Sequence, residues 1–332
     1  MGDKVVLSVV IPTYNGAKWI EDTLESVLVQ MNRYKESVEV LVRDNASTDN
    51  TEQVVEQINQ KYDNIIIYNK RNTNVIADVN FREAVTIASG EYVLMLGDDD
   101  LLMPGYIEQT LDCIEKYANV GLIYHNRIST TRDYQGASAP KHKNPNKTFK
   151  HFYENVEDFI KDYPSGPDFM SVNVVRRDCI IKGFSFAKEE YYGVEWYASM
   201  LKGLEGYTCI SLFNPLILQR APLKRTWDDK ALLYVIVGMN NMFRDLSVIY
   251  PTIYEVWLSY QNANISKLWY LTKCIPLNKE LYKEKYNELS KYLSKYEKFV
   301  AKSLIIFPSS YYVYRFLYLV NKIVKILKIN IR

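Results

Sequence analysis

The sequence contains little cysteine and histidine, and the spacing of the few that occur excludes several kinds of site. Four cysteines lie among 332 residues, with no CxxC pair and no cluster of histidine and cysteine. This pattern speaks against a zinc site or a disulfide framework and favours reduced thiols in or near the core. The three histidines are scattered, so we expect surface or loop roles for them and not catalysis. These residues are Cys113, Cys179, Cys209, Cys274, His125, His142 and His151.

Long apolar runs and a signal peptide are also lacking. No stretch of about 18 uncharged apolar residues occurs, which argues against a transmembrane helix. Asp3 and Lys4 lead straight into an apolar run, unlike a signal peptide. The net charge is +2, but residues 291–332 hold nine Lys/Arg and one acid. We therefore expect a cytoplasmic protein with a basic C-terminal segment and no nucleic-acid partner.

Short apolar runs alternate with helical patterns through the first 124 residues. Apolar runs ended by turn residues predict buried strands, and apolar residues three and four apart predict helices. The expected strands are 5–11, 38–42, 65–67, 92–96 and 120–124, and the expected helices are 17–30, 49–58, 77–88 and 104–117. This order implies an α/β fold with a mostly parallel central sheet and flanking helices.

Polar turns follow four of these strands, at residues 12–15, 44–49, 69–74 and 98–100. Each turn taken singly is more often just a turn. In parallel sheets, however, ligands bind beyond the carboxyl ends of the strands. Because the four turns would lie along one rim, we interpret them together as a binding site.

The strongest feature is the run Asp98-Asp99-Asp100 after the strand at 92–96. Three adjacent carboxylates at the end of a buried strand repel one another unless a cation compensates their charge. Carboxylate oxygens suit Mg²⁺ or Mn²⁺. The competing interpretation is an acidic helix N-terminus before Pro104, where the helix dipole favours carboxylates.

The second half of the chain has a different pattern. Residues 127–150 are polar and basic and predict a long surface loop. A strand is expected at 169–175 and a helix at 195–204. After residue 216 the pattern changes to helices rich in Tyr, Trp and Lys, so we divide the chain into a catalytic domain, 1–215, and a C-terminal helical region, 216–332.

Five segments together resemble inverting glycosyltransferases of family 2, which have the Rossmann-like GT-A fold. The resemblance extends over about 210 residues, and it is specific because the segments keep their order and spacing. The run at 72–80 and the Gly-Asp-Asp-Asp motif are similar to bacterial O-antigen and capsule enzymes, including abequosyltransferase-like members. The five segments are 8–15, 42–51, 88–92, 97–104 and 194–207.

The resemblance implies a nucleotide-sugar site. Pro12, Thr13 and Tyr14 would line the pocket for the base and ribose. Asp44 would accept a hydrogen bond from the base, and Asn80 would belong to the same site. The family often has an arginine before this asparagine, where the present chain has Val79.

The resemblance also implies the metal site and the base. Asp98 and Asp100 would hold Mn²⁺ or Mg²⁺, with Asp98 and Asp99 near the ribose and diphosphate. Glu195 would be the catalytic base that activates the acceptor hydroxyl. The family usually has Glu-Asp where this chain has Val194-Glu195. The extra methylene of glutamate changes the reach of the carboxylate but not its chemistry.

The function implied is transfer of a sugar from a nucleoside-diphosphate sugar to a glycan, a reaction of the EC 2.4 class. A UDP-sugar is favoured. Asp44 can accept from an imide N–H, which uracil and thymine have, or from guanine, whereas cytosine lacks that donor, so a CMP-sugar is disfavoured. The expected acceptor is a lipid-linked glycan of bacterial surface polysaccharide synthesis. Arg220 and Arg225 lie where a lid over the diphosphate forms, or in an ordinary basic loop.

Two other functions remain as alternatives. One is a nucleotidyltransferase on a similar sheet, which would need a glycine-rich basic phosphate loop; residues 12–18 offer one glycine and one lysine. The other is a non-catalytic sugar- or nucleotide-binding module, against which the aspartates and Glu195 argue.

The last thirty residues predict a membrane-interface segment. Lys322, Lys325, Lys328 and Arg332 have near-helical spacing with apolar residues between them. We expect residues 303–332 to bind the inner face of the cytoplasmic membrane peripherally. The alternative is that this stretch packs its apolar face on the catalytic domain.

Overall fold

The computed structural model describes residues 5–130, 150–165, 169–220 and 229–307, together with Ser310 and Tyr314. The chain divides into two compact units. Unit 1 consists of Met1–Ala187 and Glu195–Leu223, and unit 2 consists of Lys188–Val194 and Lys224–Arg332. The division of the chain into a catalytic domain, 1–215, and a C-terminal helical region, 216–332, stays a prediction.

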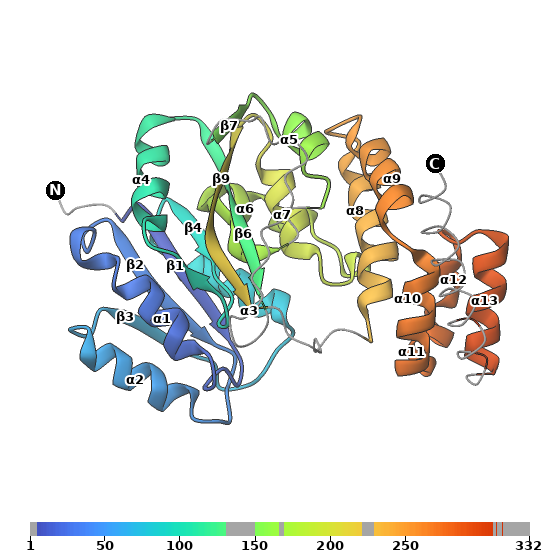
Figure 1. Cartoon of the computed structure of the whole chain (residues 1–332), viewed down its shortest axis with the longest axis horizontal. Coiled ribbons are helices and arrows are strands. Elements are labelled where there is room, and N and C mark those ends of the chain that lie inside the picture. The colour runs from blue at the N-terminus through green and yellow to red at the C-terminus, as the bar shows by residue number, and fades with distance from the viewer. Residues whose placement is uncertain are drawn as a thin grey trace, which may run out of the picture. The chain divides into compact units, whose positions relative to one another are not determined.

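The first half of unit 1 is the alternating α/β part (Figure 1). Its strands pair in parallel in the order β3-β2-β1-β4. Every residue of β1 is buried, as expected of a strand with both faces covered. The elements are β1 (Leu7–Thr13), α1 (Ile20–Leu28), β2 (Val38–Asp44), α2 (Thr51–Lys61), β3 (Ile66–Lys70), α3 (Ala77–Ile87) and β4 (Tyr92–Met95).

The second half of unit 1 makes the sheet mixed. β8 pairs antiparallel with β4 and β6, β6 pairs parallel with β9, and β5 and β7 pair antiparallel with β9. The predicted α/β fold with flanking helices is thus confirmed, with its continuous parallel part confined to β3-β2-β1-β4. The elements are β5 (Leu101–Leu102), α4 (Tyr106–Lys116), β6 (Val120–Thr130), β7 (Lys150–Tyr153), α5 (Val156–Asp162), β8 (Asn173–Arg176), α6 (Arg177–Gly183), α7 (Glu195–Gly203) and β9 (Thr208–Arg220).

Three details differ from the sequence predictions. β6 continues to Thr130, beyond the expected start of a loop at 127, because it pairs along its length with β9; residues 131–149 lie outside the described part. Met170–Val172 is a short 3₁₀ helix, η3, and not strand. His125 is fully buried, so the predicted surface role is wrong for this residue. Its ring stacks on that of Tyr106 with 4.1 Å between the ring centres. Burial lowers the pKa of His125 to about 3.

Two glycines bring α6 and α7 into backbone contact. A Cβ atom at Gly183 would lie 1.8 Å from the carbonyl oxygen of Ser199, and one at Gly203 would lie 1.7 Å from that of Cys179. Any side chain at either position would push the helices apart. This crossing fixes the path of α7, the helix that begins with Glu195.

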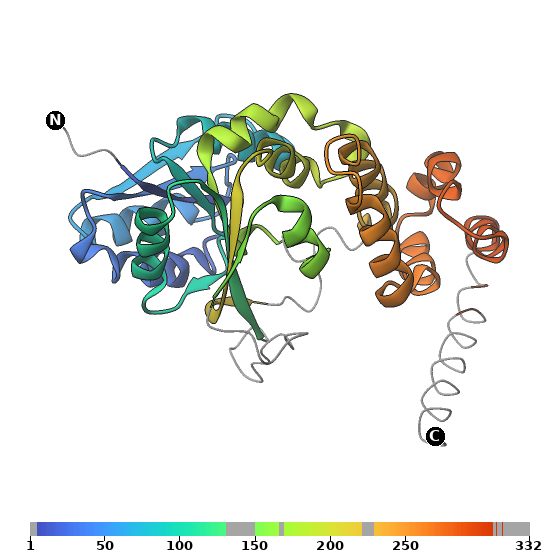
Figure 2. The same cartoon turned by 90° about the horizontal axis from the view of Figure 1, so that it is seen from above.

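Unit 2 is helical, as the sequence predicts for the C-terminal region (Figure 2). Its core contains Leu232, Leu271, Tyr282, Leu289 and Leu304. No helix among the described residues is long and apolar enough to cross a membrane. The helices are η6 (Leu233–Gly238), α8 (Met239–Leu246), α9 (Ile253–Asn264), α10 (Lys267–Cys274), η7 (Ile275–Leu277), α11 (Lys279–Glu284), α12 (Tyr286–Ser290) and α13 (Lys295–Ile306).

Candidate active site

The last residue of β1, Thr13, meets Asp98 in the turn after β4. Thr13 Oγ1 donates a hydrogen bond to Asp98 Oδ2 at 2.6 Å, and Thr23 Oγ1 donates to the backbone oxygen of Asp98 at 3.0 Å. A Cβ atom at Gly16 would lie 2.3 Å from Thr13 Oγ1 and 2.5 Å from Asp98 Oδ2, so this approach requires glycine. Burial raises the pKa of Asp98 to about 6, and the charge of Asp99 adds to this effect.

Asp100 is held by residues that come much later in the chain. Its Oδ2 accepts from Ser171 Oγ at 2.6 Å, and its Oδ1 accepts from the backbone N–H of Arg220 at 3.2 Å. The residue is only 2% exposed. Burial, followed by the charge of Asp99, raises the pKa of Asp100 to about 8. The third aspartate is therefore connected to both η3 and β9.

No pattern in the sequence indicates that Ser171 holds Asp100. Ser171 Oγ also accepts from the backbone N–H of Gly97 at 3.0 Å, so it bridges both ends of the aspartate turn. Arg220 was expected to contact a diphosphate or to lie in a basic loop. Its guanidinium is buried, lies 4.0 Å from the centre of the Trp19 ring and pairs with Asp22 at 3.0 Å. Arg225 lies outside the described residues.

The aspartate turn fits a divalent cation by its chemistry. Burial, with the charge of Asp99, raises the pKa of both Asp98 and Asp100, and a bound divalent cation would favour their ionised forms. The described residues form no group of three or more His, Cys, Asp or Glu side chains arranged around a common metal position. Two carboxylates completed by substrate phosphates are a normal arrangement for Mg²⁺. The residues present fit that arrangement.

Asp44 is fully buried and already has two hydrogen-bond partners. Its Oδ1 accepts from the backbone N–H of Ser47 at 2.7 Å, and its Oδ2 accepts from the Tyr68 hydroxyl at 2.5 Å. Burial and this bond raise the pKa of Tyr68. The structure thus joins Asp44 to β3 and not to Asp98, and Tyr68 is a partner that the sequence did not reveal.

The other expected nucleotide-binding residues differ in their exposure. Pro12 is buried, whereas Tyr14 is half-exposed. Asn80 is buried on α3, and its Nδ2 donates to the backbone oxygen of Arg43 at 3.3 Å. Its Oδ1 has no hydrogen-bond partner among the described residues. Asn80 therefore keeps one free acceptor beside β2, which is compatible with a role in ligand binding.

Glu195 is the first residue of α7. Its backbone oxygen accepts a hydrogen bond from Ser199 Oγ at 2.9 Å, a contact within the beginning of the helix. At Gly206 the backbone takes a positive φ of 86° before β9 begins, and Tyr207 packs against Gly121. The Gly-Tyr pair of the motif thus has a structural role at the far end of α7. The assignment of Glu195 as the base stays a prediction.

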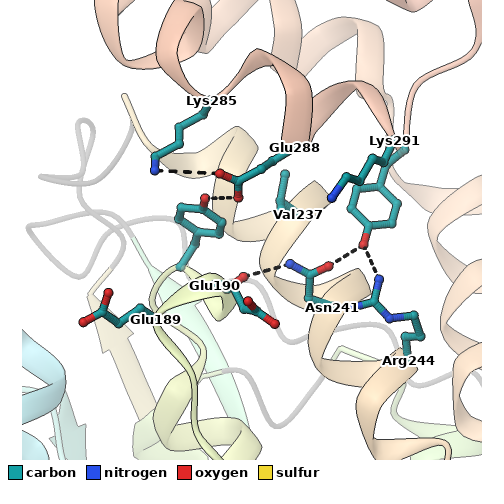
Figure 3. Close-up of a pocket in the computed structure, with 10 residues that line it drawn as sticks. Glu189, Glu190, Val237, Asn241, Arg244, Lys285, Glu288 and Lys291 are labelled. Atoms are coloured by element: carbon teal, nitrogen blue, oxygen red, sulfur yellow. Dashed lines mark hydrogen bonds and ion pairs between the residues drawn. The ribbon is translucent and has the colours of Figure 1, made fainter.

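One pocket lies within unit 2, with a volume of about 460 Å³, and none of the predicted site residues lines it (Figure 3). Several of its polar groups bond to one another (Figure 3). Asn241 Nδ2 donates to the backbone oxygen of Glu190 at 2.9 Å, and Arg244 Nη1 donates to the Tyr292 hydroxyl at 3.1 Å. Since these groups are already paired, we keep the candidate site at the aspartate turn.

Two solved structures with a similar fold contain a bound nucleotide or nucleotide sugar. The Staphylococcus aureus protein TarS 1-349 in complex with UDP gives a TM-score of 0.60 at 17% identity, covering 90% of this chain and 91% of that chain. The mannosyltransferase PcManGT of Pyrobaculum calidifontis, in complex with GDP-Man and Mn²⁺, gives 0.53 at 16% identity, covering 92% and 88%. At these identities the likeness concerns the fold, and it confirms the fold predicted from the sequence.

Sequence relatives point to the same family. The abequosyltransferase of Salmonella typhimurium is 36% identical over 98 residues, 30% of this chain and 29% of that protein. The GalNAc(5)-diNAcBac-PP-undecaprenol beta-1,3-glucosyltransferase of Campylobacter jejuni is 27% identical over 192 residues, 57% of each. The chain spans between 29% and 41% of the length of five of the curated relatives that it matches. The model of the family described as glycosyl transferase family 2 matches residues 8–183, just over half of the 332 residues. The chain therefore belongs to glycosyl transferase family 2, the family that its motifs predicted.

Proposed function

We propose that this chain is an inverting, metal-dependent glycosyltransferase that uses a nucleoside-diphosphate sugar, with a UDP-sugar favoured. The acceptor is a glycan, carried on a lipid, in the synthesis of a bacterial surface polysaccharide. The observation that carries the proposal is the junction of Thr13 with Asp98, which places the aspartate turn at the carboxyl ends of β1 and β4. The relatives that act in abequosyl and undecaprenol-linked glucosyl transfer support the substrate class.

The nucleotide lies, in this proposal, along the ends of β1 and β2. Pro12, Thr13 and Tyr14 contact the base and ribose, and Asp44 accepts from the imide N–H of uracil. Each oxygen of a carboxylate has two lone pairs, so the bonds from Ser47 and Tyr68 leave acceptor capacity on Asp44. The fixed position of the carboxylate lowers the entropy lost when the base binds.

The diphosphate lies at the aspartate turn. Asp98 and Asp100 would hold Mn²⁺ or Mg²⁺, which when bound offsets the charge that develops on the departing nucleoside diphosphate. Asp99, between them, approaches the ribose and diphosphate. Thr13 orients Asp98, and Ser171 with the backbone N–H of Arg220 orients Asp100. Both carboxylates are therefore positioned before the donor binds, which reduces the reorganisation needed during the reaction.

The acceptor reacts on the face of the sugar opposite the nucleotide. Glu195 takes the proton of the acceptor hydroxyl. At the same time the hydroxyl oxygen of the acceptor bonds to the anomeric carbon, and the bond from that carbon to the diphosphate breaks. A single displacement of this kind inverts the anomeric configuration. The close crossing at Gly183 and Gly203 keeps α7 in place on α6.

We also propose that the protein acts on the inner face of the cytoplasmic membrane, where a lipid-linked acceptor is found. The proposal concerns residues 303–332, which the structure describes only to residue 307 and at Ser310 and Tyr314. Lys322, Lys325, Lys328 and Arg332 lie outside the described residues.

A screen of nucleotide sugars for slow hydrolysis, with and without Mn²⁺, tests the proposed activity. We expect one donor, a UDP-sugar, to release its nucleoside diphosphate at a rate that depends on Mn²⁺ and is abolished by EDTA. Release of pyrophosphate from a nucleoside triphosphate and a sugar phosphate would instead identify a nucleotidyltransferase. Binding of a nucleotide sugar with no turnover, even with acceptor glycans present, would identify a binding module.

A further inference from the structure

Helix α13 has an apolar face that the rest of unit 2 leaves open. One side of the helix packs into the core through Val300, Ala301, Leu304 and Ile305. On another side, Tyr296 is 53% exposed, Phe299 is 61% exposed and Ile306 is 60% exposed, and Phe307 follows at 65%. Positions 296, 299, 303 and 306 are spaced by three, four and three residues, so they share one stripe of the helix. We call the exposed side chains of Tyr296, Phe299, Ile306 and Phe307 the α13 stripe.

Lysines accompany the α13 stripe. Lys295, Lys298 and Lys302 lie along the neighbouring side of the same helix, as their spacing of three and four residues requires. None of the three forms an ion pair with a described residue, although Lys302 lies 5.5 Å from the centre of the Tyr286 ring. The one acid of α13, Glu297, forms the capping box with Ser294. The helix therefore presents exposed apolar side chains beside positive charge with no paired acid.

We propose that the α13 stripe and its lysines dock on an anionic lipid surface. Aromatic and aliphatic side chains enter the boundary between headgroups and acyl chains, and flanking lysines contact anionic headgroups. A cluster of large exposed apolar side chains on one face of a protein usually marks a surface that binds a partner or a membrane. This inference extends the membrane part of the proposed function, and it does not depend on the catalytic part.

Charge favours a lipid surface over two other occupants. A second copy of the chain would bring a second row of lysines to the same interface, and like charges repel. The chain's own residues 308–332 contain five Lys/Arg and no Asp or Glu, so they cannot neutralise Lys295, Lys298 and Lys302. An anionic surface complements both the α13 lysines and the basic segment that follows.

Co-sedimentation of the full chain with vesicles tests the proposal. Vesicles of phosphatidylglycerol mixed with phosphatidylcholine are compared with vesicles of phosphatidylcholine alone. The apolar variant is Phe299→Ser with Ile306→Ser, and the charge variant is Lys295→Glu with Lys298→Glu and Lys302→Glu. Val248→Ser, at a position 87% exposed elsewhere in unit 2, and Lys283→Glu, in α11, are single-substitution controls for each kind of change.

We expect the wild type to bind the anionic vesicles and each α13 variant to lose about tenfold or more in partitioning, with the controls within about twofold. Thermal melts and nucleotide-sugar hydrolysis close to those of the wild type would establish that the variants are folded. No binding by the wild type, or equal binding by the variants, would overturn the proposal. Binding lost only when residues 308–332 are removed would assign docking to that segment. A dimer that the Phe299→Ser and Ile306→Ser changes convert to monomers would identify a second copy as the occupant and also overturn it.

Discussion

Thr13 Oγ1 donates a hydrogen bond of 2.6 Å to Asp98 Oδ2, and this bond connects the end of β1 to the turn that follows β4 at the proposed donor site. The contact connects a motif at the start of the chain to one that lies 85 residues later. Because Asp98 is largely removed from water, the hydroxyl donor has a strong influence on where its carboxylate points and when it ionises.

Replacing Thr13 by valine should remove this donor with little change in shape. The loss of a hydrogen bond to a charged group costs about 1.5–3 kcal/mol, so we expect metal-dependent UDP binding to weaken by about tenfold to a hundredfold. Thr13→Ser keeps the hydroxyl and should retain affinity within a few-fold. Equal affinity of the valine and serine variants in titration calorimetry would show that the contact does not orient the site.

Asp44→Ala should weaken nucleotide binding by about 1–3 kcal/mol, because the imide N–H of the base would lose its acceptor. Turnover at saturating donor should fall less. Tyr68→Phe is the matched control, since it removes one partner of Asp44 and leaves the carboxylate. Normal nucleotide affinity in Asp44→Ala, combined with lost turnover, would contradict a role in the base pocket.

The buried His125 should make stability depend on pH. Burial lowers its pKa from 6.5 to about 3, so between these values the unfolded chain binds a proton that the folded chain does not. The free energy of unfolding should therefore fall as the pH decreases from about 6.5 toward 3, with this residue contributing up to about 1.4 kcal/mol per pH unit.

Urea unfolding of wild type and His125→Phe at pH 7, 6 and 5 gives the free energy of unfolding of each protein as a function of pH. The contribution of His125 is the difference between the two slopes. The phenylalanine ring can keep the stacking on Tyr106 but cannot take up a proton. Identical slopes for wild type and His125→Phe would mean that His125 does not carry the effect.

Glu195→Gln should leave nucleotide binding intact and cut sugar transfer by about 10²–10⁴-fold, the usual contribution of a general base. Glutamine keeps the length of the side chain but cannot accept the proton of the acceptor hydroxyl. Calorimetry with UDP and a transfer assay on the same preparation separate the two effects. Near-normal transfer would assign the base to another residue.

The sequence predicts the alternating half of the fold well because its signals are local. The burial of every residue of β1 follows from a β-branched run, and α2 begins at Thr51 beside Asp49, whose Oδ1 accepts from the Thr51 backbone N–H. The order of motifs along one rim also follows from the parallel strands. Residues 12–15 and 98–100 therefore come together as expected, at Thr13 and Asp98.

The parts that were missed depend on pairing between distant segments. Ser171 lies 71 residues from Asp100, and the backbone N–H of Arg220 lies 120 residues away. No local pattern reports such contacts, because they arise only when β8 inserts beside β4 and β9 pairs with β5. His125 likewise has no neighbour in sequence that indicates its burial; the stacking on Tyr106 and the contact with Thr110 come from α4.

Calorimetry of UDP binding to wild type and Asp100→Ala, each with and without Mn²⁺, tests the central claim that the aspartate turn binds a nucleoside diphosphate through a metal. The wild type should bind UDP more tightly with Mn²⁺, and Asp100→Ala should lose most of that gain. Ser171→Ala removes one hydrogen bond to Asp100 and keeps the carboxylate, so it should lose less of the gain than Asp100→Ala does. If Asp100→Ala showed the same Mn²⁺-dependent increase in UDP affinity as the wild type, the metal assignment and the mechanism built on it would be contradicted.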